Sequence, residues 1–169
     1  MKNRVMLIGS IGAGKSTLTN ALLGKDVKAV KTQALVYRDW IVDTPGEYTE
    51  NPLFYKNIMA TALEVTHVCF IQDATGDKLI FPPGFSSGIS KLPIGVVTKA
   101  DAPDADIGRS VAKLKQAAGN APIVVTSALN GQGLGELKDL VQCSSMAEIN
   151  DYVKNSSSAH LIYGGNLYN

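Results

Sequence analysis

A three-layer α/β fold, with a mainly parallel sheet of six strands between layers of helices, is the fold class that this sequence predicts. Short apolar runs alternate along the chain with longer stretches whose apolar residues recur at helical spacing. Three of the runs are apolar throughout, as strands covered on both faces should be: 68–71, 94–97 and 123–125. In such folds the ligand binds where the strands end, and the polar motifs of this chain follow its predicted strands.

The first half of the chain predicts a strand, a helix and a hairpin. The strand is expected over 4–8 and the helix over 15–23, with Gly24 as a C-terminal stop. The segments 34–37 and 40–43 predict a tight hairpin, whose second strand joins the sheet.

The second half continues the alternation. Asn51 and Pro52 are typical of a helix start, and that helix is expected to end near residue 63. A further helix is expected over 105–118. The segment 73–92, with its proline, glycine and serine clusters, predicts at most a short helix, so a loop is expected to cover that flank of the sheet.

Residues 9–16 read Gly-Ser-Ile-Gly-Ala-Gly-Lys-Ser, a Walker A phosphate-binding loop (P-loop) set between a predicted strand and helix. Its glycines let backbone N–H groups approach phosphate oxygens, and the helix N-terminus adds partial positive charge. Lys15 is expected to reach the β- and γ-phosphates, and the Ser16 hydroxyl to bind Mg²⁺. The residues predicted to hold the nucleotide here are Gly9, Ser10, Ile11, Gly12, Ala13, Gly14, Lys15, Ser16 and Thr17.

The segment Asp43-Thr44-Pro45-Gly46 follows a short apolar strand, and it predicts the metal side of the site. Asp43 is expected to hold Mg²⁺ through water, and the Gly46 N–H to contact the γ-phosphate.

Two further motifs predict a site for the base. In Thr98-Lys99-Ala100-Asp101, the Asp101 carboxylate can accept hydrogen bonds from N1–H and N2–H₂ of guanine, an arrangement that adenine does not offer. The Lys99 stem is expected to cover the base. In Ser127-Ala128-Leu129 the Ala128 N–H could donate to guanine O6. Thr98 stands where asparagine is commoner, which leaves ATP as a possible ligand beside GTP and GDP.

Catalysis depends on a metal-binding threonine and a group that positions water. Thr32 is the expected threonine, because about seven extended residues can bring the chain back along the helix to the metal. Glu47 follows the glycine of the Asp43 motif, where many GTPases have glutamine; its charge would repel the phosphate, although it could also act as a base. Arg38, in the predicted hairpin, is the candidate for an arginine finger. We therefore expect slow GTP hydrolysis.

In the order of these four motifs, residues 3 to about 142 resemble the small GTPases of the P-loop superclass. The segments Lys31-Thr32-Gln33-Ala34 and Asp43-Thr44-Pro45-Gly46-Glu47-Tyr48 are similar to the EutP/PduV family. That resemblance implies a role in bacterial ethanolamine or propanediol utilisation, with microcompartment shell or enzyme proteins as partners.

Composition and length narrow the other possibilities. With 169 residues and a net charge of +1, the chain predicts one domain over 1–143, a short amphipathic helix over 144–154 and a flexible tail over 155–169. The charge gives no electrostatic reason to expect nucleic acid or an anionic membrane as a partner. No apolar run approaches the ~18 residues of a membrane span, and no signal peptide is evident. We expect a cytoplasmic monomer or weak dimer.

Three functions remain open on the sequence. The first is a guanine-nucleotide switch with slow Mg²⁺-dependent hydrolysis. The second is an ATP-using phosphotransferase that passes the γ-phosphoryl group to a small acceptor such as acetate. The third is a scaffold that binds nucleotide and scarcely turns it over.

Overall fold

The computed structural model describes residues 2–24, 34–78 and 80–163. The strands are β1 (Val5–Ile8), β2 (Val36–Arg38), β3 (Ile41–Asp43), β4 (His67–Asp73), β5 (Leu92–Thr98), β6 (Pro122–Val125) and β7 (Leu161–Tyr163). The α-helices are α1 (Lys15–Leu22), α2 (Glu47–Glu50), α3 (Tyr55–Ala62), α4 (Ile107–Ala118), α5 (Leu134–Gln142) and α6 (Met146–Asn155). Two short 3₁₀-helices are η1 (Pro52–Phe54) and η2 (Phe85–Gly88).

The strands form one sheet in the order β2-β3-β1-β4-β5-β6-β7. The five central strands are parallel, and the edge strands β2 and β7 are antiparallel to their neighbours. The three-layer α/β prediction is confirmed, but the predicted count of six strands is wrong. The seventh strand is β7, which pairs with β6 through Val124 and Leu161. It lies in the segment 155–169, where serines and glycines predict a flexible tail.

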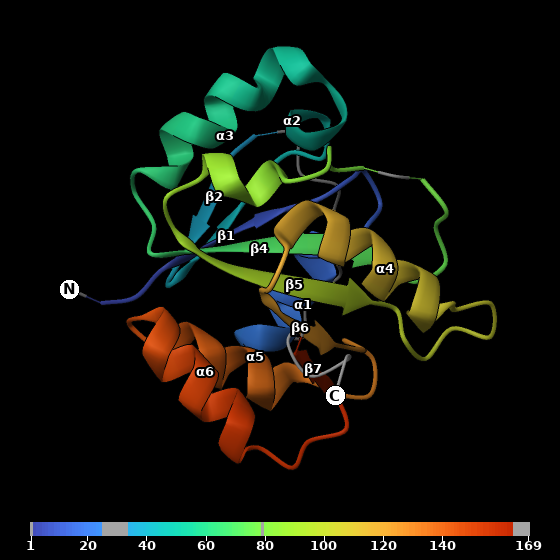
Figure 1. Cartoon of the computed structure of the whole chain (residues 1–169). Coiled ribbons are helices and arrows are strands. Elements are labelled where there is room, and N and C mark those ends of the chain that lie inside the picture. The colour runs from blue at the N-terminus through green and yellow to red at the C-terminus, as the bar shows by residue number, and fades with distance from the viewer. Residues whose placement is uncertain (1, 25–33, 79, 164–169) are drawn as a thin grey trace.

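Helices cover both faces of the sheet (Figure 1). On one face α3 and α4 contribute Ile58, Ala62, Val111 and Leu114 to a cluster that also contains Phe70 of β4. On the other face α1, α5 and α6 contribute a second cluster, listed here by its fully buried helical members: Leu18, Leu137, Leu140, Val141 and Ile149. This double cover is the reason that the central strands read as continuous apolar runs.

Side-chain caps explain where three of the helical segments begin. The Asp106 side chain accepts from the Arg109 N–H at the start of α4, so that helix begins at Ile107 and not at the expected residue 105. The Asn51 side chain accepts from the Leu53 N–H, and Ser145 accepts from the Glu148 N–H. These contacts satisfy N–H groups that have no partner within their own helix.

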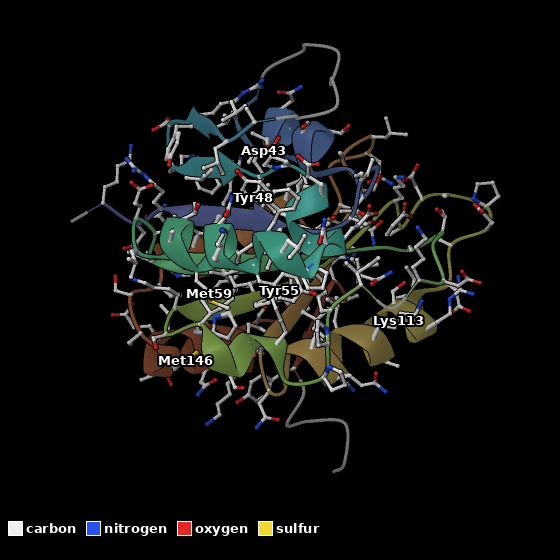
Figure 2. The ribbon with its side chains drawn as sticks, turned by 90° about the horizontal axis from the view of Figure 1, so that it is seen from above. Asp43, Tyr48, Tyr55, Met59, Lys113 and Met146 are labelled. Atoms are coloured by element: carbon white, nitrogen blue, oxygen red, sulfur yellow. The ribbon has the colours of Figure 1, made fainter. Side chains whose placement is uncertain are left out.

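An aromatic cluster covers the flank of the sheet for which the sequence predicts little helix. Phe81 and Phe85, on either side of the Pro82-Pro83-Gly84 turn, pack edge-on to Phe70 of β4, and Tyr55 of α3 closes over Phe85. Figure 2 looks down on this side, with Tyr55 and Met59 on α3. A loop therefore covers the flank, as expected.

The C-terminal helix α6 packs on its own domain. Ile149 is fully buried and Val153 is 8% exposed, both against the cluster formed with α5. The Tyr152 hydroxyl donates to Asp139 of α5 at 2.9 Å. No helix among the described residues has the length and apolar character needed to span a membrane.

Candidate nucleotide-binding site

The four predicted motifs meet at one edge of the sheet. They follow β1, β3, β5 and β6, all of which run in the same direction and lie within five neighbouring positions of the strand order. Their carboxyl ends therefore lie along one edge, which is the ligand-binding edge of doubly wound α/β sheets.

The P-loop turns sharply between β1 and α1. Gly14 has φ 95°, in the left-handed region that side chains disfavour, and it sits directly before the first residue of α1. The loop is braced from β5, because the buried Thr98 hydroxyl donates to the Ala13 carbonyl at 2.6 Å. Thr98 thus holds the phosphate loop, a role that its place in the predicted base motif does not reveal.

Lys15 lies inside the P-loop. Its Nζ donates to the carbonyls of Gly9 and Ser10, each at 2.9 Å, and only 6% of the residue is exposed. This burial lowers the pKa of Lys15 to about 8, although the negative charges of Asp43 and Glu50 act in the opposite direction. Burial thus disfavours the charged form of Lys15 in the free loop, and a bound anion would stabilise that form.

Ser16 and Asp43 form the pair of oxygens expected to face a metal. The Ser16 hydroxyl donates to Asp43 Oδ2 at 2.6 Å, and Asp43 is 2% exposed. A hydroxyl and a carboxylate are hard oxygen ligands of the kind that Mg²⁺ prefers, so the residues present fit that ion.

The Asp43 motif also packs against the P-loop. Gly46 lies against Ile11, and a Cβ at Gly46 would overlap the Ile11 backbone. A side chain there would push the loop after β3 away from the P-loop, which explains the glycine.

Lys99 ties three loops together. Its backbone has φ 60°, and its Nζ donates to the Gly12 carbonyl and to Asp73 Oδ2, each at 2.7 Å. Asp73 ends β4 and also accepts from the backbone and hydroxyl of Thr75. Burial alone would raise the pKa of Asp73, but the hydrogen bonds from Lys99 and Thr75 outweigh it and leave that pKa lowered. The Lys99 stem is therefore held across the opening beside the P-loop.

A pocket of about 310 Å³ lies beside this stem, between the P-loop helix and the loops after β5 and β6. It is lined by Gly14, Thr17, Leu18, Thr98, Lys99, Asp101, Ala102, Thr126, Ala128 and Leu129. Most of the residues predicted to surround a base are thus brought together. Asp101 stands at the pocket with its Oδ1 accepting from the buried Ser127 hydroxyl at 2.7 Å. This bond orients the carboxylate.

A second pocket, also of about 310 Å³, lies at the other end of the P-loop. Ser10 and Ile11 line it together with Glu50 of α2, with Asp73 at the end of β4, and with Asp77 and Lys78 of the loop that follows. The two pockets share no lining residue.

Besides Asp43, the Glu50 carboxylate contacts the P-loop. The Ile11 N–H donates to Glu50 Oε1 at 3.2 Å. Glu47 is exposed at the first position of α2, and its catalytic role stays a prediction. Thr32 lies outside the described residues.

Arg38 lies away from the P-loop. It pairs with Ile41 at the amino end of β3, whereas Asp43 stands at the carboxyl end. Its guanidinium donates to Asn20 on α1 at 2.8 Å. This position does not suit an arginine finger, which has to reach the phosphates.

Sequence reasoning missed two residues of this site, Asp73 and Glu50. Asp73 could have been found, since it is an acidic residue at the carboxyl end of a buried strand of the parallel sheet. Glu50 carries no such signal, because its contact with Ile11 joins residues 39 positions apart through the packing of a four-residue helix.

A family model described as "Ethanolamine utilisation - propanediol utilisation" matches residues 1–143. The "Propanediol utilization protein PduV" of Citrobacter freundii is 36% identical over 134 residues, which are 79% of this chain and 89% of that protein. The "Probable acetate kinase EutP" of Escherichia coli K12 is 35% identical over an alignment of 138 residues, and the match covers 80% of this chain and 87% of that protein.

A solved structure of Era from Aquifex aeolicus, bound to GDP and AlF₄⁻, superposes on this chain with a TM-score of 0.57 at 24% identity. The match covers 86% of this chain and 58% of that one, and it shows the P-loop GTPase-like fold. Because the family model spans most of the residues, and the PduV and EutP proteins align over about four fifths of the chain, this chain belongs to the PduV-EutP family of ethanolamine and propanediol utilisation proteins.

Proposed function

We propose that this chain is a Mg²⁺-dependent guanine-nucleotide-binding protein that hydrolyses GTP slowly and serves ethanolamine or propanediol utilisation. The observation that carries the proposal is the pocket beside the P-loop, where Ser127 orients the Asp101 carboxylate and the Lys99 stem forms a wall. The nucleotide in the Era structure and the GTPase-like fold support the same ligand class.

The base is selected by hydrogen bonds that only guanine can complete. The Asp101 carboxylate accepts from guanine N1–H and N2–H₂, and the Ala128 N–H, at the same pocket, donates to O6. Adenine would leave the carboxylate without these donors and place an amino group against the Ala128 N–H. A tenfold preference for guanine corresponds to only about 1.4 kcal/mol, a modest demand on a charged contact.

The phosphates are held by the P-loop and its lysine. On binding, Lys15 Nζ exchanges its bonds to the Gly9 and Ser10 carbonyls for phosphate oxygens. Mg²⁺, when bound through Ser16 and Asp43, would neutralise phosphate charge. Thr32 is proposed as the threonine that reads the γ-phosphate.

We propose that hydrolysis is slow because neither Glu47 nor Arg38 is suited to assist the attack of water on the γ-phosphate. Glu47 brings a negative charge toward the phosphate side, and Arg38 is engaged with Asn20 at the other end of β3. An arginine held at that place does not stabilise the charge that develops in the transition state.

A phosphotransferase is the second candidate, favoured by the name of the EutP relatives. In that reaction the oxygen of an acceptor carboxylate would form a bond to the γ-phosphorus as the bond to the bridging oxygen of the nucleoside diphosphate breaks. The pocket at the far end of the P-loop could hold the acceptor, but Glu50, Asp73 and Asp77 line it beside the single cation Lys78. Such a lining repels acetate, and for this reason we place hydrolysis first.

The experiment is isothermal titration of the protein with GTP, GDP, ATP and ADP, each with Mg²⁺. Guanine nucleotides should bind at least ten times more tightly. Asp101→Ala should remove this preference, whereas Asp104→Ala, at an exposed neighbouring acid, should keep it. Equal affinity for GTP and ATP in the parent protein would contradict the guanine assignment.

Product analysis separates the three functions. Release of inorganic phosphate from GTP without acetate indicates hydrolysis, formation of acetyl phosphate with acetate indicates phosphotransfer, and bound but unconverted nucleotide indicates a scaffold.

We further propose that this protein associates with a microcompartment in the cytoplasm, as the family of this chain suggests. Co-sedimentation with microcompartment shells would test it.

A further inference from the structure

We propose that Glu50 of α2 acts as a sensor of the γ-phosphate, favouring bound diphosphate over triphosphate and coupling the position of α2 to the nucleotide state. The inference rests on the proposed nucleotide binding. It deepens that function by naming a residue that sets which nucleotide is preferred.

The Glu50 carboxylate lies against the backbone of the P-loop. Glu50 Oε1 accepts the Ile11 N–H at 3.2 Å, and P-loop N–H groups are the donors that bind phosphate oxygens. The same carboxylate acts electrostatically on the Lys15 ammonium. The Glu50 carboxylate therefore interacts with the Ile11 N–H and the Lys15 ammonium, two groups that are also suited to a phosphate oxygen.

The positions of the two pockets indicate which phosphate group would compete with the Glu50 carboxylate. The base pocket adjoins Gly14 and Thr17, whereas Glu50, Ser10 and Ile11 line the pocket at the opposite end of the loop. A nucleotide whose base lies beside Gly14 extends its phosphates toward Ile11. The terminal group of a triphosphate reaches closest to Glu50, and a diphosphate lacks that group.

The third step is the consequence for α2. The helix is tethered to the P-loop at both ends, since Gly46 before it packs on Ile11 and Glu50 at its end accepts the Ile11 N–H. Repulsion by a γ-phosphate releases the Glu50 end and leaves the Gly46 end in place. Tyr48 of α2 stacks on Phe54 of η1, with ring centroids 5.6 Å apart, so the movement would be passed to the segment that precedes α3.

The test compares affinities for GDP and for a non-hydrolysable GTP analogue, with Mg²⁺, in four proteins: the parent, Glu50→Gln, Glu50→Ala and Glu64→Gln. Glu50→Gln keeps an acceptor for the Ile11 N–H and removes the charge. Glu64→Gln makes the same chemical change at an exposed site that contacts Tyr37 instead of the P-loop. Both Glu50 variants should bind the triphosphate about fivefold more tightly relative to GDP than the parent does, a change of about 1 kcal/mol. Glu64→Gln should match the parent.

Amide hydrogen exchange over residues 48–51 gives the readout for α2. In the parent, these amides should exchange faster with the triphosphate analogue than with GDP, because the end of α2 is released. In Glu50→Ala they should exchange equally fast with both. A parent-like affinity ratio in both Glu50 variants would overturn the inference while leaving nucleotide binding intact. A parent protein that binds neither nucleotide would overturn the proposed function and this inference with it.

Discussion

The lowered pKa of Lys15 in the P-loop makes nucleotide binding depend on pH. Lys15 has a pKa of about 8 because its ammonium is buried, and a phosphate beside it stabilises the charged form again. Nucleotide binding should therefore take up protons where the free protein has partly lost this one. The sign follows from the direction of the shift: the bound state holds more protons, so affinity falls as pH rises through 8.

We predict an uptake of about 0.5 proton per nucleotide at pH 8 and about 0.1 at pH 7. Titration calorimetry in two buffers of different ionisation enthalpy measures this number. Lys56→Ala, at an exposed lysine of α3, should leave it unchanged. An uptake of zero at pH 8 would show that Lys15 is already fully charged in the free protein.

Glu47 is the second residue whose chemistry can be tested directly. Glu47→Gln removes the negative charge that we propose to face the phosphates, and it keeps a side chain that can hydrogen-bond water. We predict severalfold faster GTP hydrolysis in single-turnover measurements. Loss of about 100-fold or more would instead identify Glu47 as a general base.

Among the elements, α6 has an apolar face formed by Met146, Ile149 and Val153, which by the sequence alone could pack on the domain or dock on a partner. The complete burial of Ile149 against the cluster on α5 favours packing. We predict that Ile149→Ala lowers the free energy of unfolding by about 2–5 kcal/mol. Lys154→Ala, at an exposed position of the same helix, should change it by less than about 0.5 kcal/mol.

Denaturant unfolding measures both α6 variants. A parent-like stability for Ile149→Ala, combined with loss of shell co-sedimentation, would make α6 a docking element. Denaturant unfolding also measures the stability of a chain that ends at Gln142 and therefore lacks all of α6.

At the scale of the whole molecule, β7 closes one edge of the sheet. The Val125 N–H donates to the His160 carbonyl just before this strand, and the Ser158 hydroxyl donates to Glu136 of α5. Removing residues 156–169 would leave β6 as an open edge that can pair with another chain. We predict a lower melting temperature and concentration-dependent self-association, measured by thermal unfolding and light scattering. An unchanged monomer with the parent melting temperature would mean that β7 contributes little.

Local patterns predicted the central strands, the P-loop and the motif positions, because apolar period and glycine placement are properties of neighbouring residues. The short apolar runs of β1, β4 and β5 are too short for helices and rich in β-branched residues, and they therefore indicate buried strands. Parallel strands then bring their carboxyl-end motifs to one edge without further information. This reasoning suffices to bring Asp101 near the P-loop.

The tertiary structure alone decided which side chains meet across that edge. The Thr98 brace on Ala13, the Lys99–Asp73 ion pair and the Glu50 contact with Ile11 join residues 85, 26 and 39 positions apart. Each depends on loop conformations and on the order of strands, which no local period encodes. The strand β7 is of the same kind, since its three residues become a strand only because β6 offers an unpaired edge. By itself, then, the sequence determined an α/β domain with a P-loop and with its motifs at one edge of the sheet, because these are properties of neighbouring residues. Long-range packing determined how its loops are braced and which carboxylate contacts the Ile11 end of the P-loop.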